Sequence, residues 1–431
     1  MKVGICGFGT VGSGTLKVLA RNQKDIAARA GGPIVVTRIA SRTPPADDVD
    51  LNGASFSVDV QSVIQAPDVD VVVETIGGTT IAREVILGAI AAGKHVVTAN
   101  KALIAEHGAE IFEAAEQAGV TVAYEAAVAG GIPVIKAMRE GLVANRIEWL
   151  AGIINGTGNF ILTEMGEKNR DFEDVLKEAQ ALGYAEADPT FDVEGIDAAH
   201  KLTILASTAF GVPLQFSGAY TEGISQITVQ DMAYAQELGY QIKHLGIARR
   251  LDNGFELRVH PTLVPESHLI ASVNGVMNAV LVNGDAVGQT LYYGAGAGSE
   301  ATASAVIADL VDIARTARQD ARSGVPHLGF ASEHLSEEPV VPIEDIQSAY
   351  YLRMLAEDRP GVLARVATLL SEHGINIESI MQKESELADG RIPLIMLTHT
   401  VREADLNHAV AAIEKLPEIC GHVFRIRVEH F

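Results

Sequence analysis

Short, wholly apolar segments alternate with amphipathic segments over the first third of the chain. Strands are predicted at residues 2–6, 33–41, 69–78, 94–100 and 121–128, with helices between them, such as the one at 80–92. Strands that are apolar along their whole length are typical of a parallel sheet covered by helices on both faces. The pattern therefore predicts a doubly wound α/β domain over about residues 1–135.

The pattern changes from about residue 136 to residue 300, where strands predicted at 149–157, 255–264 and 278–284 are mixed with helices. This mixture predicts a second, α+β domain, expected to bind substrate and to form the dimer interface. A glycine cluster beginning at residue 293 opens a long amphipathic helix. We expect that helix, at about 300–318, to return to the first domain and complete it.

A polar segment with several prolines follows at about residues 319–348 and is interpreted as a linker. Residues 349–431 then follow the order strand, helix, strand, strand, helix, strand, which predicts a ferredoxin-like domain. The fold class is thus α/β, with a Rossmann-type parallel sheet first, a central α+β domain, and a small C-terminal module.

Composition narrows the classes of function. The 431 residues are 48% hydrophobic and 20% charged, with a formal net charge of -22. Such acidity, without a basic stripe, disfavours a nucleic-acid partner. A membrane role is not expected, since no apolar run approaches the roughly 20 residues that span a bilayer. The N-terminus resembles no signal peptide, and the two cysteines, Cys6 and Cys420, suggest no disulfide framework, so we expect a cytoplasmic protein.

The segment GFGTVG carries the first candidate chemistry. Gly7, Gly9 and Gly12 form the pattern G-x-G-x-x-G directly after a strand and directly before a helix, with Phe8, Thr10 and Val11 between them. Glycines at this turn let the backbone approach a pyrophosphate, which lies against the positive N-terminus of the helix. The six residues are therefore expected to bind a dinucleotide cofactor.

The end of the second strand bears on which cofactor binds. An NAD site usually has an acidic residue there, to accept hydrogen bonds from the ribose hydroxyls. This chain has Ser41 and Arg42 instead, and Arg42 could pair with a 2′-phosphate. We therefore expect NADP, with NAD as the alternative; an ordinary solvated arginine is the other interpretation of Arg42.

Residues 184–202, YAEADPTFDVEGIDAAHKL, gather acidic side chains ahead of one lysine. A solvated loop is one interpretation. The other is a structured site, in which Asp197 and Lys201 share one face of a helix, so that Asp197 keeps the ammonium charged and oriented. Glu186 and Asp192 would then hold a cationic group such as the amino group of an amino acid. Lys101 adds a second ammonium at the ligand-binding edge of the first sheet.

Six motifs, in this order, resemble the homoserine dehydrogenase family and cover nearly all of residues 1–320. They are GFGTVGSG, TANKALIA, YEAAVAGGIPVIKAM, INGTGNFIL, GYAEADPTFDVEGIDAAHKL and YGAGAGSEATASAV. The resemblance implies NAD(P)-dependent interconversion of L-homoserine and L-aspartate 4-semialdehyde, a step toward threonine, methionine and isoleucine.

The same resemblance implies roles for individual residues. Lys201 matches the family's proton donor, and Lys101 matches a lysine that assists proton transfer and touches the cofactor. Glu186, Asp192 and Asp197 match substrate-binding positions. Two glycines, Gly183 and Gly298, match positions near the cofactor, although ordinary turn glycines would look the same.

The resemblance also implies a monovalent cation, expected to be sodium. Its ligands would be Glu125 and the backbone carbonyls of Val128, Gly130 and Ile132. A carboxylate with carbonyl oxygens suits a hard cation. Glu125 could equally be a buried acid held by hydrogen bonds.

The C-terminal segment LAEDRPGVLARVATLLSEHGINIESI, residues 355–380, resembles an ACT domain, a regulatory module that binds small molecules. Asp358 and Gly361 lie in the turn that enters its helix, and Asn376 follows the end of that helix. ACT domains usually pair and bind an amino acid at their interface. The resemblance implies feedback by L-threonine and a homodimer or homotetramer, with dimerisation alone as the other interpretation.

Two rival functions were considered. A phosphorylating semialdehyde dehydrogenase needs a thiol nucleophile, but neither Cys6 nor Cys420 is placed for attack. A non-catalytic nucleotide-sensing regulator with an amino-acid-binding ACT module would not need Lys101, Lys201 and the acidic segment together. An enzyme is the preferred interpretation.

Overall fold

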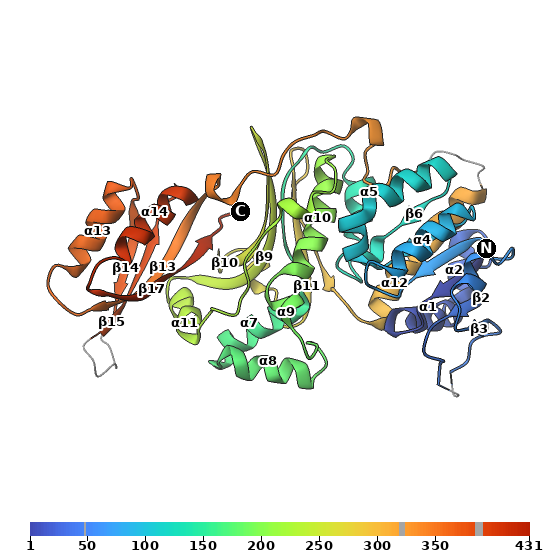
Figure 1. The fold of residues 1–431 in the computed structure, drawn as a ribbon, viewed down its shortest axis with the longest axis horizontal. Coiled ribbons are helices and arrows are strands. Elements are labelled where there is room, and N and C mark those ends of the chain that lie inside the picture. The colour runs from blue at the N-terminus through green and yellow to red at the C-terminus, as the bar shows by residue number, and fades with distance from the viewer. Residues whose placement is uncertain (47–48, 319–323, 384–390) are drawn as a thin grey trace.

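The computed structural model describes residues 1–46, 49–318, 324–383 and 391–431. The molecule is elongated, with the N-terminal sheet and its helices at one end, the C-terminal module at the other, and a long central sheet between them (Figure 1). The predicted α/β class, with a parallel N-terminal sheet, is confirmed.

The N-terminal sheet has six parallel strands in the order β3-β2-β1-β4-β5-β6. Alternate residues of its apolar strands enter different cores: Val71 and Val73 of β4 pack with α1 and α12, whereas Val72 packs with α4 and α5. This two-sided burial explains why the strands are apolar throughout. The elements are β1 (Lys2–Cys6), α1 (Thr10–Arg21), α2 (Gln23–Ala30), β2 (Val35–Ala40), β3 (Ser55–Ser57), α3 (Gln61–Ile64), β4 (Val71–Glu74), α4 (Ile81–Ala91), β5 (His95–Thr98), α5 (Lys101–Ala118) and β6 (Val122–Ala123).

Helix α12 (Ser299–Arg318) lies against α1, at the place in the sequence where a returning helix was expected. Arg21 of α1 forms a bidentate ion pair with Glu300, and Ser299 Oγ donates to the carbonyl of Thr10 at 2.7 Å. The beginning of α12 therefore lies beside the glycine loop.

The second sheet has eleven strands, nine of them in the order β12-β11-β7-β9-β10-β17-β13-β15-β14. Its central part consists of β7 (Ile147–Ile153), β9 (Tyr240–Leu251), β10 (Gly254–Pro265), β11 (Met277–Gly284) and β12 (Gly288–Ala295), with β8 (Tyr220–Thr221) paired to β10. The accompanying helices are α6 (Val134–Lys136), α7 (Gly156–Lys168), α8 (Phe172–Ala181), α9 (Thr190–Val193), α10 (Ile196–Phe210) and α11 (Val229–Glu237). Helix α10 crosses α5, which joins the two domains.

The C-terminal module has the predicted ferredoxin-like order. Its elements are β13 (Gln347–Glu357), α13 (Val362–Glu372), β14 (Ile377–Gln382), β15 (Arg391–Thr398), the short β16 (Val401–Arg402), α14 (Glu403–Ile413) and β17 (Ile419–Val428). The module is not a separate sheet, however. Its last strand, β17, pairs in parallel with β10 of the central domain, with Leu263 opposite Val428.

Buried ion pairs cross this junction. Arg258 of β10 donates to Glu429 at 2.5 Å and to Glu256, and all three side chains are almost fully buried. Arg427 of β17 lies between Glu222 of the central domain and Glu403 of α14. The central sheet and the module are therefore one structure.

Some predicted boundaries differ from those observed. The strand predicted at 121–128 is only Val122–Ala123, and the strand predicted at 149–157 ends at Ile153, because the chain turns into α7 at Gly156. The predicted linker begins in residues 319–323, which lie outside the described residues. Its later part is packed against the central domain, where Val340 pairs with Phe255.

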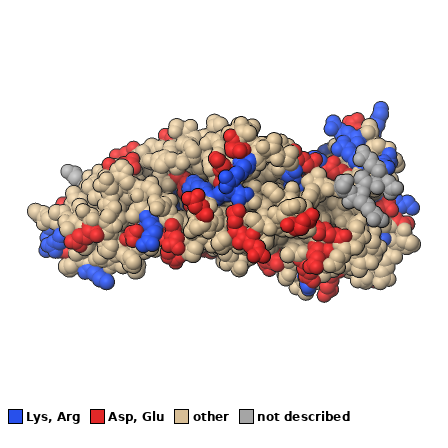
Figure 2. All heavy atoms as spheres, turned by 90° about the horizontal axis from the view of Figure 1, so that it is seen from above, with Lys and Arg blue, Asp and Glu red and all other residues tan. Residues whose placement is uncertain are grey.

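The surface seen in Figure 2 carries charges of both signs. On the face seen in Figure 2, lysine and arginine side chains lie beside aspartate and glutamate side chains. Among the described residues, no helix has both the length and the apolar character needed to cross a bilayer.

Candidate active site

The glycine loop between β1 and α1 is shaped by close backbone contacts. Gly7 has φ of 99°, and a Cβ there would lie 2.6 Å from the carbonyl oxygen of Thr75. A Cβ on Gly12 would lie 2.1 Å from the carbonyl oxygen of Gly7, whereas a Cβ on Gly9 would meet no atom of the surrounding chain within 4 Å. Gly7 and Gly12 thus allow tight packing, and Gly9 leaves open space over the N-terminus of α1, as a pyrophosphate requires.

A buried acid supports the neighbouring loop at the end of β4. Glu74 accepts hydrogen bonds from the backbone N–H groups of Ile76 and Gly77 and from the hydroxyl of Thr98. Burial raises the pKa of Glu74, against the effect of these hydrogen bonds. Thr75 Oγ1 donates to the carbonyl of Gly7 at 2.7 Å. Glu74 is not among the residues predicted from sequence, although an acid that ends an apolar strand is a signal of such a role.

Helices α5 and α10 bring two lysines to one carboxylate. Nζ of Lys201 lies 2.6 Å from Oδ2 of Asp197, and Nζ of Lys101 lies 3.2 Å from Oδ1 of the same residue. Lys201 also donates to the carbonyl oxygen of Ile154 at 2.7 Å. Since an ammonium has three N–H groups, Lys201 keeps one donor beyond these two contacts.

Electrostatics hold Asp197 in its ionised form. Burial alone would raise the pKa of Asp197, but the ammonium groups of Lys201 and Lys101 outweigh that effect and lower it to about 2. Asp197 is therefore a permanent counter-ion for the two lysines at neutral pH. The lysines approach it from different domains, so the cluster lies where the domains meet.

Asn155 joins the acidic residues into one cluster. Its Nδ2 donates to Oδ1 of Asp192 at 2.8 Å and to Oδ2 of Asp197 at 2.9 Å, while its Oδ1 accepts from the backbone N–H of Gly158 and caps α7. Asn155 is not among the residues predicted from sequence. An asparagine that follows a strand and precedes a helix is an N-cap signal that could have indicated its place.

The predicted substrate-binding acids differ in their surroundings. Asp192 of α9 is partly buried, and burial raises its pKa, although the amide of Asn155 opposes this. Glu186 is exposed, and its backbone carbonyl accepts from Gln180. The structure thus brings Asp192, Asp197, Lys201 and Lys101 together and places Glu186 on the loop that leads to them.

The other predicted cofactor residues lie around the glycine loop or on exposed turns. Gly298, with φ of 123°, immediately precedes α12 beside that loop. Gly183, with φ of 77°, follows α8 at the start of the acidic segment. Arg42 follows β2 and is exposed, and it forms no hydrogen bond or ion pair with any other described residue. Phe8 and Val11 are half-buried, and Thr10 is exposed.

The predicted cation loop is buried beneath α12. Glu125 accepts from the backbone N–H groups of Ile135 and Lys136, and burial raises its pKa to about 7 despite these bonds. The carbonyl of Ile132 accepts from the N–H of Val134. Within the described chain, the carbonyls of Val128 and Gly130 accept no hydrogen bond. Two buried carbonyls without donors, in the same loop as a carboxylate, are oxygen ligands of the kind that suits a hard cation.

The predicted regulatory residues lie at opposite ends of α13. Asp358 and Gly361 belong to the turn before the helix, which lines a cavity of about 350 Å³. Asn376 follows the helix, and its carbonyl accepts from His399. A helix of 11 residues is about 16 Å long. One small ligand therefore cannot touch both ends within one chain.

Neither cysteine is placed as a nucleophile. Cys6 is fully buried in β1, and burial, with the nearby charge of Glu74, raises its pKa to about 12. Cys420 lies on β17 of the C-terminal module. A thiol mechanism therefore has no candidate near the lysine pair.

Known proteins of one family are similar to this chain over nearly its whole length. Residues 7–125 match the family described as homoserine dehydrogenase, NAD binding domain; residues 133–311 match homoserine dehydrogenase; and residues 350–418 match the ACT domain. The homoserine dehydrogenase of Pseudomonas aeruginosa is 66% identical over 429 residues, which cover 100% of this chain and 99% of that protein. The chain belongs to the homoserine dehydrogenase family.

Other homoserine dehydrogenases are also similar to this chain over its full length. The homoserine dehydrogenase of Neisseria gonorrhoeae is 52% identical and covers 100% of this chain and 98% of its own length. A crystal structure of a homoserine dehydrogenase from Thiobacillus denitrificans superimposes with a TM-score of 0.95 at 59% identity, covering 100% of this chain and 98% of that one. As a member of the homoserine dehydrogenase family, the chain is an NAD(P)-dependent oxidoreductase. The alternative of a non-catalytic regulator is thereby set aside.

Proposed function

We propose that Lys201 is the proton donor in the reduction of L-aspartate 4-semialdehyde to L-homoserine, with Lys101 beside it. The observation that carries this proposal is the single carboxylate of Asp197, held between the two ammonium groups at the meeting of the domains. The nicotinamide, when bound, supplies the hydride. The ammonium of Lys201 stabilises the charge that develops on the aldehyde oxygen and gives it a proton.

Positioning supports the choice of Lys201 as donor. Its side chain is 12% exposed, compared with 36% for Lys101. Asp197 and the carbonyl of Ile154 direct two of its N–H groups inward and leave the third for substrate. Lys101, at the carboxyl edge of the first sheet, is proposed to touch both the substrate and the cofactor.

The partly buried Asp192 is proposed to hold the amino group of the substrate. An ammonium would offset the burial that raises the pKa of this carboxyl. Glu186 is proposed to add a second carboxylate from the exposed loop. The amide of Asn155 fixes the orientation of Asp192 relative to Asp197.

Lys201→Ala tests the central role. We expect NADPH binding, followed by nicotinamide fluorescence, to be unchanged, while kcat falls by a factor on the order of 10² to 10⁴. Lys177→Ala, which removes an exposed lysine of α8, is the matched control and should keep full activity. Near-normal turnover by Lys201→Ala would exclude this lysine as the donor.

The preference for NADP is proposed to come from Arg42. Its guanidinium is exposed and unpaired within the described chain, at the end of the strand where NAD sites usually carry an acid. A 2′-phosphate is a suitable partner for such a guanidinium.

A monovalent cation, sodium, is proposed to bind in the loop after β6. Glu125 would supply one carboxylate oxygen, and Val128, Gly130 and Ile132 would supply carbonyl oxygens. The support is the buried carbonyls without donors, together with a carboxylate whose pKa burial raises to about 7. A bound cation would favour the ionised carboxylate and fix the loop.

The ACT module is proposed to bind L-threonine at the turn that contains Asp358 and Gly361. Because Asn376 lies at the far end of α13, it can reach the same ligand only from a second copy, which favours a homodimer or a homotetramer. Threonine should then alter both activity and mass, measured by kinetics and light scattering. A titration that changes neither quantity would rule out the regulatory role.

A further inference from the structure

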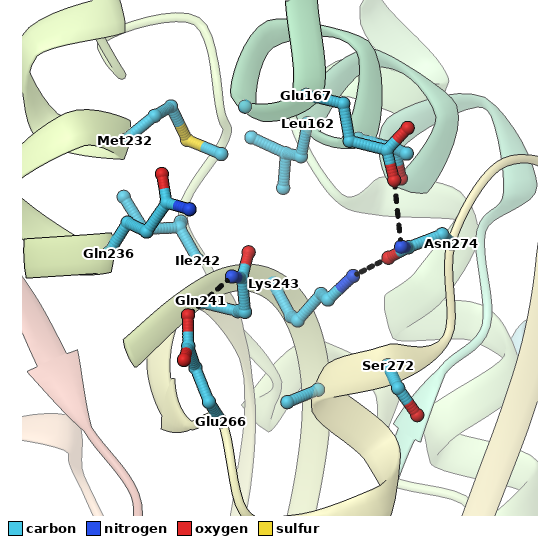
Figure 3. A pocket seen from close by; sticks show the side chains of 13 residues that line it. Leu162, Glu167, Met232, Gln236, Gln241, Ile242, Lys243, Glu266, Ser272 and Asn274 are labelled. Atoms are coloured by element: carbon cyan, nitrogen blue, oxygen red, sulfur yellow. Dashed lines mark hydrogen bonds between the residues drawn. The ribbon is translucent and has the colours of Figure 1, made fainter. Parts of the chain in front are cut away.

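A second cavity, of about 240 Å³, lies between α7, α11 and β9 (Figure 3). Neither the lysine pair nor Asp197 is part of its wall, so it is not the site described above. Met232 and Gln236 extend into it from α11, and Leu162 and Glu167 extend from α7 on the other side. The remaining lining residues are Thr163, Gly166, Gln241, Ile242, Lys243, Glu266, Ala271, Ser272 and Asn274.

Lys243 of β9 is an unusual wall residue because it is 2% exposed. Its Nζ donates to the carbonyl of Val273 and to Oδ1 of Asn274, both at 2.8 Å. Within the described chain, no carboxylate lies within ion-pair distance of this ammonium. Burial lowers its pKa to about 8, although the charge of Glu167 opposes this effect. The hydrogen-bond partners of this buried charge are both neutral, which is costly, and one N–H group remains for an anion.

Carboxylates lie elsewhere on the same wall. Glu167 accepts from Nδ2 of Asn274 at 2.9 Å, and Glu266 accepts from Nε2 of Gln241 at 2.9 Å. Among the described residues, each carboxylate therefore has one amide hydrogen-bond partner and no cation at ion-pair distance. Figure 3 shows that these two pairs flank Lys243, with the apolar side chains of Leu162 and Met232 opposite.

We infer that this cavity binds a small free amino acid. The α-carboxylate of the ligand would pair with Lys243, its ammonium with the carboxylate of Glu167 or Glu266, and a short side chain would contact Leu162 and Met232. The volume is below the usual range of about 300–1,000 Å³ for ligand pockets, so a nucleotide is too large. The combination of one buried cation, two carboxylates and an apolar wall is complementary to a zwitterion.

The two helices that line the cavity also contact the rest of the machinery. Helix α7 begins at the cap formed by Asn155, which holds the active-site acids. The first turn of helix α11 contains Asp231, whose carboxylate accepts from Arg353 and Tyr351 of β13. A ligand between these helices would thus contact an element of the active site and an element attached to the ACT module.

Calorimetric titration of the full-length protein tests the inference. The probes are glycine, L-alanine, L-serine, L-threonine and L-methionine. We expect at least one probe to bind, and expect Lys243→Met to weaken that binding at least tenfold. Gln236→Trp fills the cavity from its exposed rim and leaves Lys243 in place. It should weaken binding to the same extent. This variant tests the inference even if Lys243→Met does not fold.

Two control variants assign the binding to this cavity. Asp358→Ala alters the ACT turn, and Lys201→Ala alters the active site; binding that depends on Lys243 should be unchanged in both. The inference is overturned if none of the five probes binds. It is equally overturned if binding survives Gln236→Trp, or if it is lost in Asp358→Ala or Lys201→Ala.

Discussion

The charge of Asp197 should stabilise the folded protein by an amount that depends on pH. The two lysines lower its pKa from 3.8 to about 2. A shift of one pKa unit corresponds to about 1.4 kcal/mol. The ionised carboxylate therefore contributes about 2 kcal/mol to the free energy of unfolding. Because the folded-state pKa is the lower one, this contribution is complete above about pH 4 and is lost as the pH falls through 2. Asp197→Asn removes it.

The assay uses Trp149, the only tryptophan of the chain, which lies on β7 in the central sheet. Urea unfolding followed by its fluorescence should give a difference of about 2 kcal/mol between the unaltered protein and Asp197→Asn at pH 7. At pH 3 the difference should be about half as large, since the unfolded carboxylate is then mostly protonated. Asp174→Asn, an exposed change on α8, should show no difference at either pH. If the difference in free energy of unfolding between the unaltered protein and Asp197→Asn were the same at pH 7 and pH 3, the two lysines would not stabilise the charge of Asp197 as argued.

Three further predictions concern cofactor and cation. Gly9→Ala should fold and weaken NADPH binding at least tenfold, whereas Gly12→Ala should cost about 1–3 kcal/mol of stability through its contact with Gly7; equal melting temperatures would contradict this. Arg42→Ala should raise KM for NADPH about tenfold and leave KM for NADH unchanged. An equal rise in KM for NADH would contradict a contact between Arg42 and the 2′-phosphate. Replacing sodium by choline at constant ionic strength should lower the melting temperature of the unaltered protein but not of Glu125→Gln; a sodium-independent melting temperature excludes the cation site.

Local patterns were sufficient for the N-terminal sheet and for the Asp197–Lys201 pair. The glycine loop has a characteristic spacing, and residues four apart on a helix necessarily share a face. The contact between Lys101 and Asp197 has no such local signal, because it depends on how α5 crosses α10. The position of Lys101 at the ligand-binding edge of the sheet indicated a functional role, but not this contact.

Other features depended on hydrogen bonds that no periodicity reveals. The strand after residue 121 is short because the chain turns at Glu125, whose carboxylate holds the start of α6. Asn155 connects Asp192 and Asp197 through its side-chain amide, which the sequence shows only as a possible helix cap. The pairing of β10 with β17 joins segments separated by more than 150 residues, and parallel pairing at such a distance leaves no local pattern.

The position of β17 has a consequence for synthesis of the protein. One neighbour of β10 in the central sheet, β17, is synthesised more than 150 residues after β10. Until then, Arg258 lacks the carboxylate of Glu429, and the part of β10 at Thr262 and Leu263 lacks the strand that pairs with it. An unpaired edge attracts other strands, so a chain arrested before Ile419 should aggregate, even though every residue of the dehydrogenase centre has already been made.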